Sequence, residues 1–216
     1  MIRMGMDPKC AALNAGTRVF DSAVVAQADG SLADVFVRVD GAFPQMAPPT
    51  EPVVVAQRRC VYGPRVVGMR VGQTLRIRND DELLHNVHSS SAKGNAFNVG
   101  QPKAGIVFDF TPKTEEIMVK LGCDVHRWMT AYVGVVSHPY FGVSGGGGLF
   151  EIDHVPAGTY TIRAWHERLG ELSKSVTVRA GAVSTVDLAY PESERPMKVF
   201  GPVEGTLAEK DALSVP

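Results

Sequence analysis

The amino-acid sequence predicts an all-β protein with two sandwiches, a larger one followed by a smaller one. Short runs rich in Val, Ile, Thr and aromatic residues recur along the chain, and this composition is typical of strands. Gly, Pro, Asn and Asp separate the runs and favour turns there. No stretch shows the sustained period of about 3.6 residues that marks an amphipathic helix. The chain has 216 residues, which is enough for one large β domain or two small ones.

The N-terminal part, residues 1–30, is the least regular. Two short strands are expected within residues 19–26. Apolar and polar residues then alternate over residues 34–40, as in a half-buried strand. The next segment, residues 43–52, contains four prolines. It is expected to be a loop, because proline cannot donate to a strand ladder.

The middle of the chain contains a series of apolar, β-branched runs that predict strands. These runs are residues 52–57, 66–71, 73–79, 104–110, 116–121 and 131–136. The last two flank a short segment that carries a Cys, a His and a Met, so this segment is expected to be a loop between two strands.

Four consecutive glycines, Gly145–Gly148, mark a change in character. Glycine adopts positive φ freely, so this run predicts a turn or joint. Further strands are expected at residues 149–152, 159–165, 173–178 and 183–188. Residues 191–216 combine scattered prolines with scattered charge and predict a C-terminal tail.

The charge balance argues against one class of function. Lys and Arg number 22 and Asp and Glu number 23, so the formal net charge is −1. A dedicated nucleic-acid-binding protein usually shows a basic field instead. No apolar run reaches the length of a membrane span, and no signal peptide is present in the given chain. We expect a periplasmic or secreted protein whose export signal lies outside the given residues.

Four residues are expected to form the ligand set of one metal site. Cys123, His126 and Met129 lie within seven residues, and His85 lies upstream. A thiolate and two imidazoles in a trigonal plane, with a weak axial thioether, are typical of blue-copper electron-transfer centres. Soft sulfur ligands suit copper, so the sequence predicts one copper ion bound by these four side chains.

The spacing Cys-x2-His-x2-Met excludes a regular strand, because alternate side chains of a strand point to opposite faces. A tight loop between the strands at residues 116–121 and 131–136 is needed to bring Cys123, His126 and Met129 to one ion. His85 follows the strand at residues 73–79 through a turn-like Asp-Asp pair.

The segment from about Ser31 to Val136 resembles the cupredoxins, and its ligand loop is similar to the short loop of amicyanins. Residues 79–87, Asn-Asp-Asp-Glu-Leu-Leu-His-Asn-Val, are similar to the first-histidine segment of plastocyanins and amicyanins. The resemblance implies a cupredoxin-like Greek-key β-sandwich over residues 31–137 with one type 1 copper per chain. It also implies that Asn86 ties the two ligand loops together.

The same resemblance implies a carrier of single electrons between redox partners rather than a catalyst. His126 would be the ligand nearest the surface, and Trp128 and Tyr132 would border the electron-exit surface. The partner would be a cytochrome c-like protein, a dehydrogenase or an oxidase that docks transiently. The extra C-terminal segment, together with Cys10 and Cys60, departs from amicyanin and leaves the identity of the partner open.

Other interpretations of the ligand set stay open. A zinc site can use Cys and His, but Met is a poor zinc ligand. Cys123 could be a nucleophile beside His126, but no oxyanion hole or third orienting residue is evident nearby. Two further alternatives are a copper-dependent enzyme with an open coordination position, and a binding or structural protein with a vestigial or storage copper site.

The remaining histidines are not expected to bind this metal. His88 would face away from His85 in a strand. His138, His154 and His166 are expected to make ordinary polar contacts rather than a second metal site.

Cys10 and Cys60 remain as an even pair once Cys123 is assigned to the metal. They are candidates for a disulfide, which requires an oxidising compartment. The alternative is two unpaired buried thiols.

Residues 138–190 resemble the carboxypeptidase regulatory-like (transthyretin-like) β-sandwich module. The resemblance rests on Phe150-x-Ile152, on the run from Val155 to Tyr160, and on a closing Val-x-Val strand with a turn at Gly181. It covers fewer residues than the whole module, so missing strands are expected from residues 1–30. Such a module carries no catalysis by itself.

Overall fold

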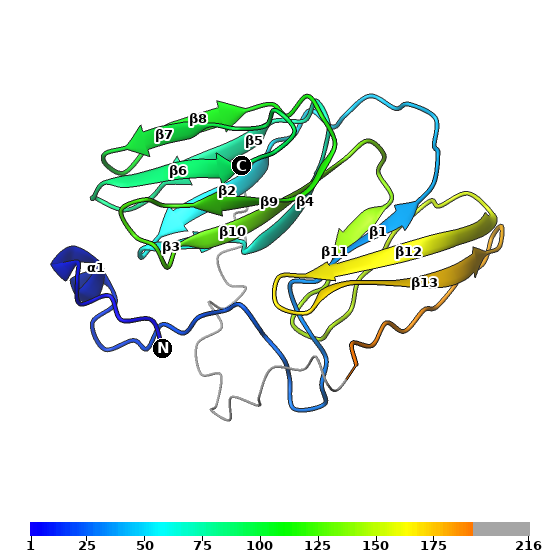
Figure 1. Ribbon diagram of the computed structural model, residues 1–216, viewed down its shortest axis with the longest axis horizontal. Helices are drawn as coiled ribbons and strands as arrows, with labels where there is room; N and C mark the ends of the chain where they lie inside the picture. Colours follow the sequence, from blue (N-terminus) through cyan, green and yellow to red (C-terminus); the bar gives the residue numbers. More distant parts are fainter. Residues whose placement is uncertain (192–216) are drawn as a thin grey trace.

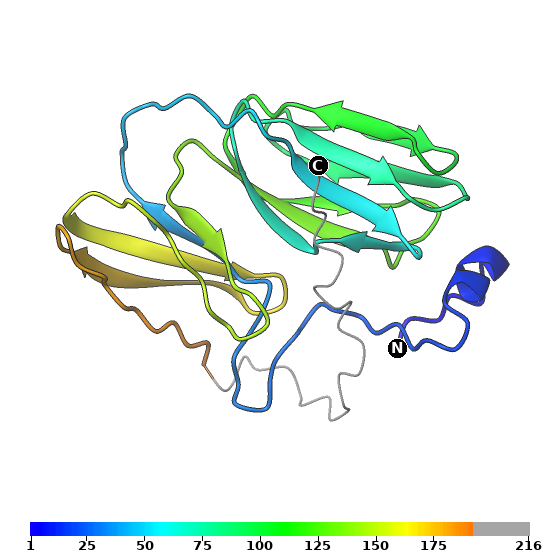
Figure 2. The same cartoon turned by 180° about the vertical axis from the view of Figure 1, so that it is seen from behind.

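The computed structural model describes residues 1–191, so the expected tail lies outside the described residues apart from Pro191. The described chain contains thirteen strands and one short helix, and the all-β prediction is confirmed. The strands form three sheets in two units that lie side by side (Figures 1 and 2). No helix within residues 1–191 combines the length and the apolar character needed to cross a membrane.

The larger unit is a sandwich of two sheets. One sheet has the order β4-β10-β9-β6-β7 and the other the order β3-β2-β5-β8. Its strands are β2 Val53–Arg58, β3 Val61–Gly63, β4 Val66–Arg70, β5 Leu75–Asn79, β6 His85–Ser90, β7 Asn98–Gln101, β8 Val107–Phe110, β9 Glu116–Gly122 and β10 Thr130–Val136. Two pairs, β2 with β5 and β4 with β10, are parallel. The sequence analysis did not predict β6 and β7, which are rich in polar residues.

The core of the larger unit lies between its two sheets. Val55 and Ile77 face inward from β2 and β5, and Leu121 and Val133 face them from β9 and β10. All four side chains are fully buried. Burying one such side chain stabilises the fold by roughly 1.5–3 kcal/mol. Because side chains alternate along each strand, each sheet has one apolar face, and these two faces pack together.

The smaller unit is one sheet with the order β11-β1-β12-β13. Its strands are β1 Phe36–Asp40, β11 Phe141–Val143, β12 Gly158–His166 and β13 Gly170–Val178. The sequence analysis grouped residues 34–40 with the larger sandwich, but β1 pairs with β11 and β12. Alternation predicted the strand correctly; it carries no information about which distant strands complete the hydrogen bonds.

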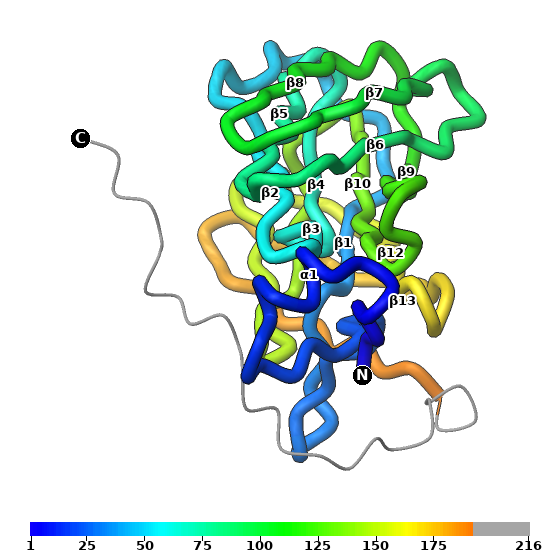
Figure 3. Tube along the Cα trace, turned by 90° about the vertical axis from the view of Figure 1, so that its left-hand side faces the viewer, coloured from blue at the N-terminus to red at the C-terminus, as the bar shows by residue number. Residues whose placement is uncertain are grey.

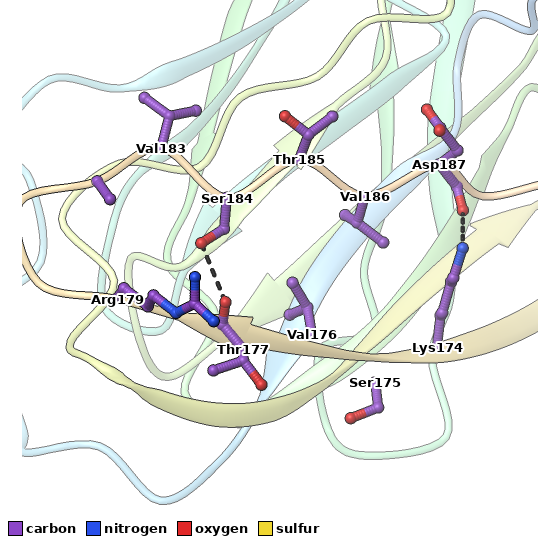
Figure 4. Close-up of a pocket in the computed structure, with 11 residues that line it drawn as sticks. Lys174, Ser175, Val176, Thr177, Arg179, Val183, Ser184, Thr185, Val186 and Asp187 are labelled. Carbon is purple, nitrogen blue, oxygen red and sulfur yellow. Dashed lines mark hydrogen bonds between the residues drawn. The ribbon is translucent and has the colours of Figure 1, made fainter.

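Two expected strands of the smaller unit, residues 149–152 and 183–188, lie outside every sheet. Residues 183–187 run beside β13 and bound a polar pocket there (Figure 4). Ser184 Oγ donates to the Thr177 carbonyl oxygen at 3.0 Å, and Lys174 Nζ donates to the Asp187 carbonyl oxygen at 2.8 Å. Side-chain bonds rather than a backbone ladder therefore hold this segment against the sheet edge.

The two units meet where glycines leave room for aromatic rings. A Cβ atom on Gly134 of β10 would lie 2.6 Å from Phe36 Cζ, and one on Gly68 of β4 would collide with the Phe141 ring. Phe36 is fully buried. Only a residue without a side chain permits this close approach of ring and backbone.

The N-terminal segment forms one unexpected helix, α1, Pro8–Leu13. Asp7 caps it by accepting from the Lys9 and Cys10 N–H groups, and Pro8 occupies its first turn. Both residues favour a helix start, but six residues are too few to show a helical period. The helix lies at the β3 end of the larger unit (Figures 1 and 3).

The expectation that residues 1–30 complete the smaller sheet was wrong. Within these residues the only strand-like pairing is an isolated bridge from Ala26 to Leu32. Met4 and Cys10 instead belong to the core cluster of the larger unit. The N-terminal segment is therefore part of the larger unit, and β1 supplies the strand that the smaller sheet needed.

A disulfide joins Cys10 of α1 to Cys60 in the β2–β3 turn. The Asn14 side chain donates to the Cys10 and Arg59 carbonyl oxygens, both at 2.9 Å. The Arg59 guanidinium donates in return to the Leu13 carbonyl oxygen at 3.3 Å. Covalent and polar contacts thus fix α1 on the β2–β3 turn.

Candidate metal centre

The loop that carries three predicted ligands turns between β9 and β10. Cys123 directly follows β9 and Met129 directly precedes β10. The His126 N–H donates to Cys123 Sγ at 3.4 Å, and the Met129 N–H donates to the His126 carbonyl oxygen at 2.8 Å. These bonds fold the loop back on itself, as the spacing of the ligands requires.

His85, Cys123 and His126 converge in the interior at this end of the sandwich. One donor atom from each lies within 4.8 Å of the other two. The two Nδ1 atoms are 3.0 Å apart, and Cys123 Sγ is 3.8 Å from His126 Nδ1. Each residue is at most 3% exposed. Met129 is equally buried and belongs to the same core cluster as Cys123.

A carboxylate holds the remote nitrogen of each imidazole. His85 Nε2 donates to Asp81 Oδ2 at 2.9 Å, and His126 Nε2 donates to Asp7 Oδ2 at 3.0 Å. An ionised carboxylate only accepts, so a neutral imidazole bound in this way keeps a lone pair on Nδ1. Two lone pairs facing each other at 3.0 Å beside a sulfur repel unless a cation lies between them. The donor set and its outer carboxylates therefore fit a metal ion.

Asp81 is itself held in place by the backbone. Its carboxylate accepts from the Arg59 and Cys60 N–H groups at 2.7 Å and 2.8 Å. Burial acts to raise the pKa of Asp81, but these bonds and the one from His85 outweigh it and keep the pKa below its ordinary value. Burial acts to lower the pKa of His85, and the neighbouring Asp81 and Cys123 outweigh it and raise the pKa.

Cys123 is prepared for ligation because its thiolate is stabilised. Burial acts to raise its pKa, but the neighbouring His85 side chain and hydrogen bonds from the Asn86 and His126 N–H groups outweigh it and lower the pKa from 9.0 to about 7. The thiolate is the form of cysteine that binds metals.

We expect the Cys123 thiol to titrate near pH 7 in the metal-free protein. The ultraviolet absorbance of the thiolate should rise to half its final value close to that pH, and the Cys123→Ser variant should lack the rise. The depressed pKa of Cys123 stabilises the metal-free fold above the pKa of the unfolded chain, about 9. That stability is lost as the pH falls through about 7. A midpoint near the ordinary value would show that the hydrogen bonds to the sulfur do not form in solution.

Asn86 bridges the two ligand segments. Its Oδ1 accepts from the Asp124 N–H at 2.6 Å, and its Nδ2 donates to Asp124 Oδ2 at 2.7 Å and to Asn98 Oδ1 at 2.9 Å. The residue after one ligand is thereby tied to the residue after another, as the resemblance to plastocyanins and amicyanins implied.

His126, which is expected to be the ligand nearest the surface, is covered in the structure. His126 is 1% exposed. Its Nε2 edge faces Asp7 at 3.0 Å and Cys10 Sγ at 3.5 Å. The reason is the disulfide to Cys60, which holds α1 across this edge. Nothing local to the ligand loop indicates that cover.

Trp128 and Tyr132 occupy different environments. The half-buried Trp128 ring lies 5.1 Å, centroid to centroid, from the His126 ring, and its indole N–H donates to the Cys60 carbonyl oxygen at 2.8 Å. Tyr132 instead packs on Trp165 at 5.0 Å. Burial and the nearby Glu167 raise the pKa of Tyr132 to about 12.

The other four histidines lie apart from the ligand group. His88 pairs with Asp124 at 2.7 Å, and His138 Nδ1 accepts from the Tyr140 N–H. His166 Nδ1 accepts from the Arg168 N–H, and His154 is exposed. Within residues 1–191, no candidate metal group contains any of these four histidines.

Sequence reasoning missed the two carboxylates that orient the ligands. Asp81 was noted only as part of a turn, and Asp7 was not singled out. An Asp directly before Pro8 is a helix-start signal, which could have located α1. Its contact with His126, 119 positions away in sequence, could not be read from the sequence.

No protein-family model matches the sequence, and no curated protein matches it. Among solved structures, the chain is similar to a Cu-containing nitrite reductase from Thermus scotoductus SA-01 at 20% identity and a TM-score of 0.37. That match covers 44% of this chain, which spans about a quarter, 24%, of the reductase.

Two smaller proteins are also similar over part of the chain. A purple cupredoxin from Nitrosopumilus maritimus is 25% identical, with a TM-score of 0.34, over 38% of this chain and 97% of that one. An oxidised amicyanin variant is 22% identical, with a TM-score of 0.35, over 39% of this chain and 81% of that one. The distances, the burial and the donor chemistry of His85, Cys123 and His126 are what indicate a metal centre.

Proposed function

We propose that this protein is a type 1 copper protein that carries single electrons between redox partners. The supporting observation is the convergence of one donor atom each from His85, His126 and Cys123 within 4.8 Å at a buried position. Met129, buried in the cluster around Cys123, is the proposed axial ligand. A thiolate, two imidazoles and a thioether are the blue-copper ligand set.

Each residue of the site has a proposed role. Cys123 supplies the thiolate, and His85 and His126 supply the two imidazole nitrogens. Asp81 and Asp7 orient those imidazoles through their Nε2 atoms, and Asn86 holds the ligand segments together. One bound copper ion would supply the one-electron couple. The burial of all four ligands excludes water, which favours electron transfer over a copper enzyme with an open position.

The visible absorption spectrum of the copper-loaded protein tests this function. An intense thiolate-to-copper band that is insensitive to added azide supports it. A colourless protein would support a binding or structural role with a vestigial or storage site. Loss of the band on adding azide would indicate an open coordination position and hence an enzyme.

Met129→Gln is expected to lower the reduction potential while copper stays bound. A soft thioether favours the cuprous state, whereas the harder amide oxygen favours the cupric state. A shift of about 60 mV would correspond to a tenfold change in the one-electron equilibrium. Voltammetry on both proteins measures it, with Met69→Gln in the core of β4 as a comparison of the same chemical change. An unchanged or higher potential in Met129→Gln would show that Met129 is merely packed in the loop.

The remaining features concern the compartment, the redox partner and the C-terminal module. A disulfide is expected in an oxidising compartment, which supports a periplasmic or secreted location. A transient redox protein of the cytochrome c, dehydrogenase or oxidase kind is the proposed partner. We also propose that residues 138–190, completed by β1, form a carboxypeptidase regulatory-like module with a scaffolding role.

A further inference from the structure

The edge of His126 that points away from the ligand group is closed. Asp7 Oδ2 lies 3.0 Å and Cys10 Sγ lies 3.5 Å from its Nε2 atom, and the residue is 1% exposed. Since Cys10 is bonded to Cys60, α1 cannot swing away while the disulfide is intact. A redox partner therefore cannot touch this imidazole directly.

The ring of Trp128 continues the contact from His126 toward the surface. Within residues 1–191, the ring neighbours of His126 are His85, which is fully buried, and Trp128, which is half-buried. The indole N–H bond to the Cys60 carbonyl oxygen fixes the ring next to the disulfide. Among the aromatic side chains described, Trp128 is thus the one that both touches the His126 ring and reaches solvent.

Trp128 opens into a cleft of about 260 Å³, which we call the Trp128 groove. Its lining includes Trp128, Tyr132, Lys120, Arg127, Arg168 and the carboxylate Asp21, with an Arg65–Glu167 pair at its side. The register of β9 and β10 places Lys120 opposite Tyr132, so both side chains stand on the same outer face of the sheet.

The outward charge of the Trp128 groove is positive. Glu167, 5% exposed, is neutralised by Arg65, whose guanidinium donates to it at 2.7 Å and 2.9 Å. Arg168 is 59% exposed. Arg65 and Arg168 each lie 3.6 Å from an Asp21 carboxylate oxygen, a longer contact than the Arg65–Glu167 pair. Lys120 and Arg127 are exposed and have no acidic partner within salt-bridge distance in the described part of the chain. Three cations and one carboxylate, Asp21, therefore face solvent beside Trp128, which leaves the groove with an excess of two positive charges.

We propose that the Trp128 groove is the docking surface for an acidic redox protein. The inference rests on the proposed function and adds where the partner binds and what charge it carries. Carboxylates around the partner's own redox centre would pair with Lys120, Arg127 and Arg168 and bring that centre against Trp128. Charge complementarity of this kind raises the association rate and weakens with salt.

Small oxidants of opposite charge test the proposal on the reduced, copper-loaded protein. Each hexacyanoferrate(III) ion, or each tris(phenanthroline)cobalt(III) ion, removes one electron and is itself reduced. In Lys120→Glu, oxidation by hexacyanoferrate should slow about three- to tenfold, and oxidation by the cobalt complex should speed up, at low ionic strength. Both effects should shrink in about 1 M salt, where the Debye length falls to about 3 Å.

Lys113→Glu is the matched control. Lys113 is exposed and precedes β9 at the end opposite Cys123, so the same change in net charge occurs far from the groove. We expect less than about a twofold change in either rate for this variant. Equal effects of Lys120→Glu and Lys113→Glu would overturn the proposal, as would no effect of either.

A peptide probe reports on docking without any electron transfer. Titration of decaglutamate into the diamagnetic copper(I) protein should shift the Trp128 indole N–H resonance, with the Trp165 indole as internal reference. Lys120→Glu should abolish the shift and Lys113→Glu should retain it; no shift in the native protein overturns the proposal. The titration can be repeated on the metal-free chain, so it tests docking independently of copper. A missing thiolate-to-copper band would reject the proposed function, whereas a missing peptide shift would reject the docking surface.

Discussion

Replacing Cys123 by Ser is expected to abolish the proposed coloured copper centre completely while the β fold persists. Cys123 is the only free cysteine among residues 1–191, since Cys10 and Cys60 are joined to each other. A serine hydroxyl at this position has no thiolate to give the intense band. The measurement is the visible spectrum of the copper-loaded variant, and far-ultraviolet circular dichroism checks the fold.

Cys10→Ser/Cys60→Ser serves as the control for Cys123→Ser. It removes two sulfurs but no ligand, so its copper band should persist. A charge-transfer band retained in Cys123→Ser would show that the thiolate comes from elsewhere and would refute the ligand assignment. If Cys123→Ser loses its β signal, this variant and the native protein are compared in the metal-free state, where both should unfold cooperatively.

Removing the disulfide with Cys10→Ser/Cys60→Ser is expected to lower the free energy of unfolding by about 4 kcal/mol. The two cysteines are separated by 50 positions, and closing a loop of that size restricts the unfolded chain by roughly this amount on the chain-entropy model. Urea unfolding of the metal-free proteins measures the difference. The free α1 should also expose the His126 edge, so small oxidants of either charge should react faster.

Thiol titration of the unfolded, unreduced and metal-free native chain checks the premise of that prediction. One free thiol per chain is expected, and three would rule out the disulfide in solution. Leu13→Ala, on the exposed side of α1, is a control that should change neither the thiol count nor the oxidation rates. If Cys10→Ser/Cys60→Ser reacted faster with the anionic oxidant but not with the cationic one, the cause would be a change in local charge rather than an uncovered imidazole.

The candidate metal centre could be predicted from the sequence because its information is local. Cys123, His126 and Met129 lie in one short loop between two strongly β-branched strands, and the requirement to meet one ion constrains how that loop can turn. His85 could be added because the donor chemistry of copper calls for a second imidazole. The structure brings His85, Cys123 and His126 together.

The strands were also largely predictable, whereas their partners were not. Alternation over residues 34–40 identified β1, but its pairing with β11 and β12 depends on residues more than 100 positions away. Polar strands such as β6, which begins at His85, carry little apolar periodicity, so their hydrogen bonding becomes visible only when the neighbouring strands are in place.

The sequence by itself determined that this protein is all-β. It also determined that one loop carries a thiolate, an imidazole and a thioether at a spacing that lets all three reach one ion. Only the tertiary structure decided that Asp81 and Asp7 hold the imidazoles, that α1 closes the outer edge of His126, and that Trp128 opens into a cationic groove. The physical reason is that ligand spacing and strand alternation are short-range properties of the chain. The cover over a site and the charge around it come from segments that meet only when a disulfide and a packed core bring them together.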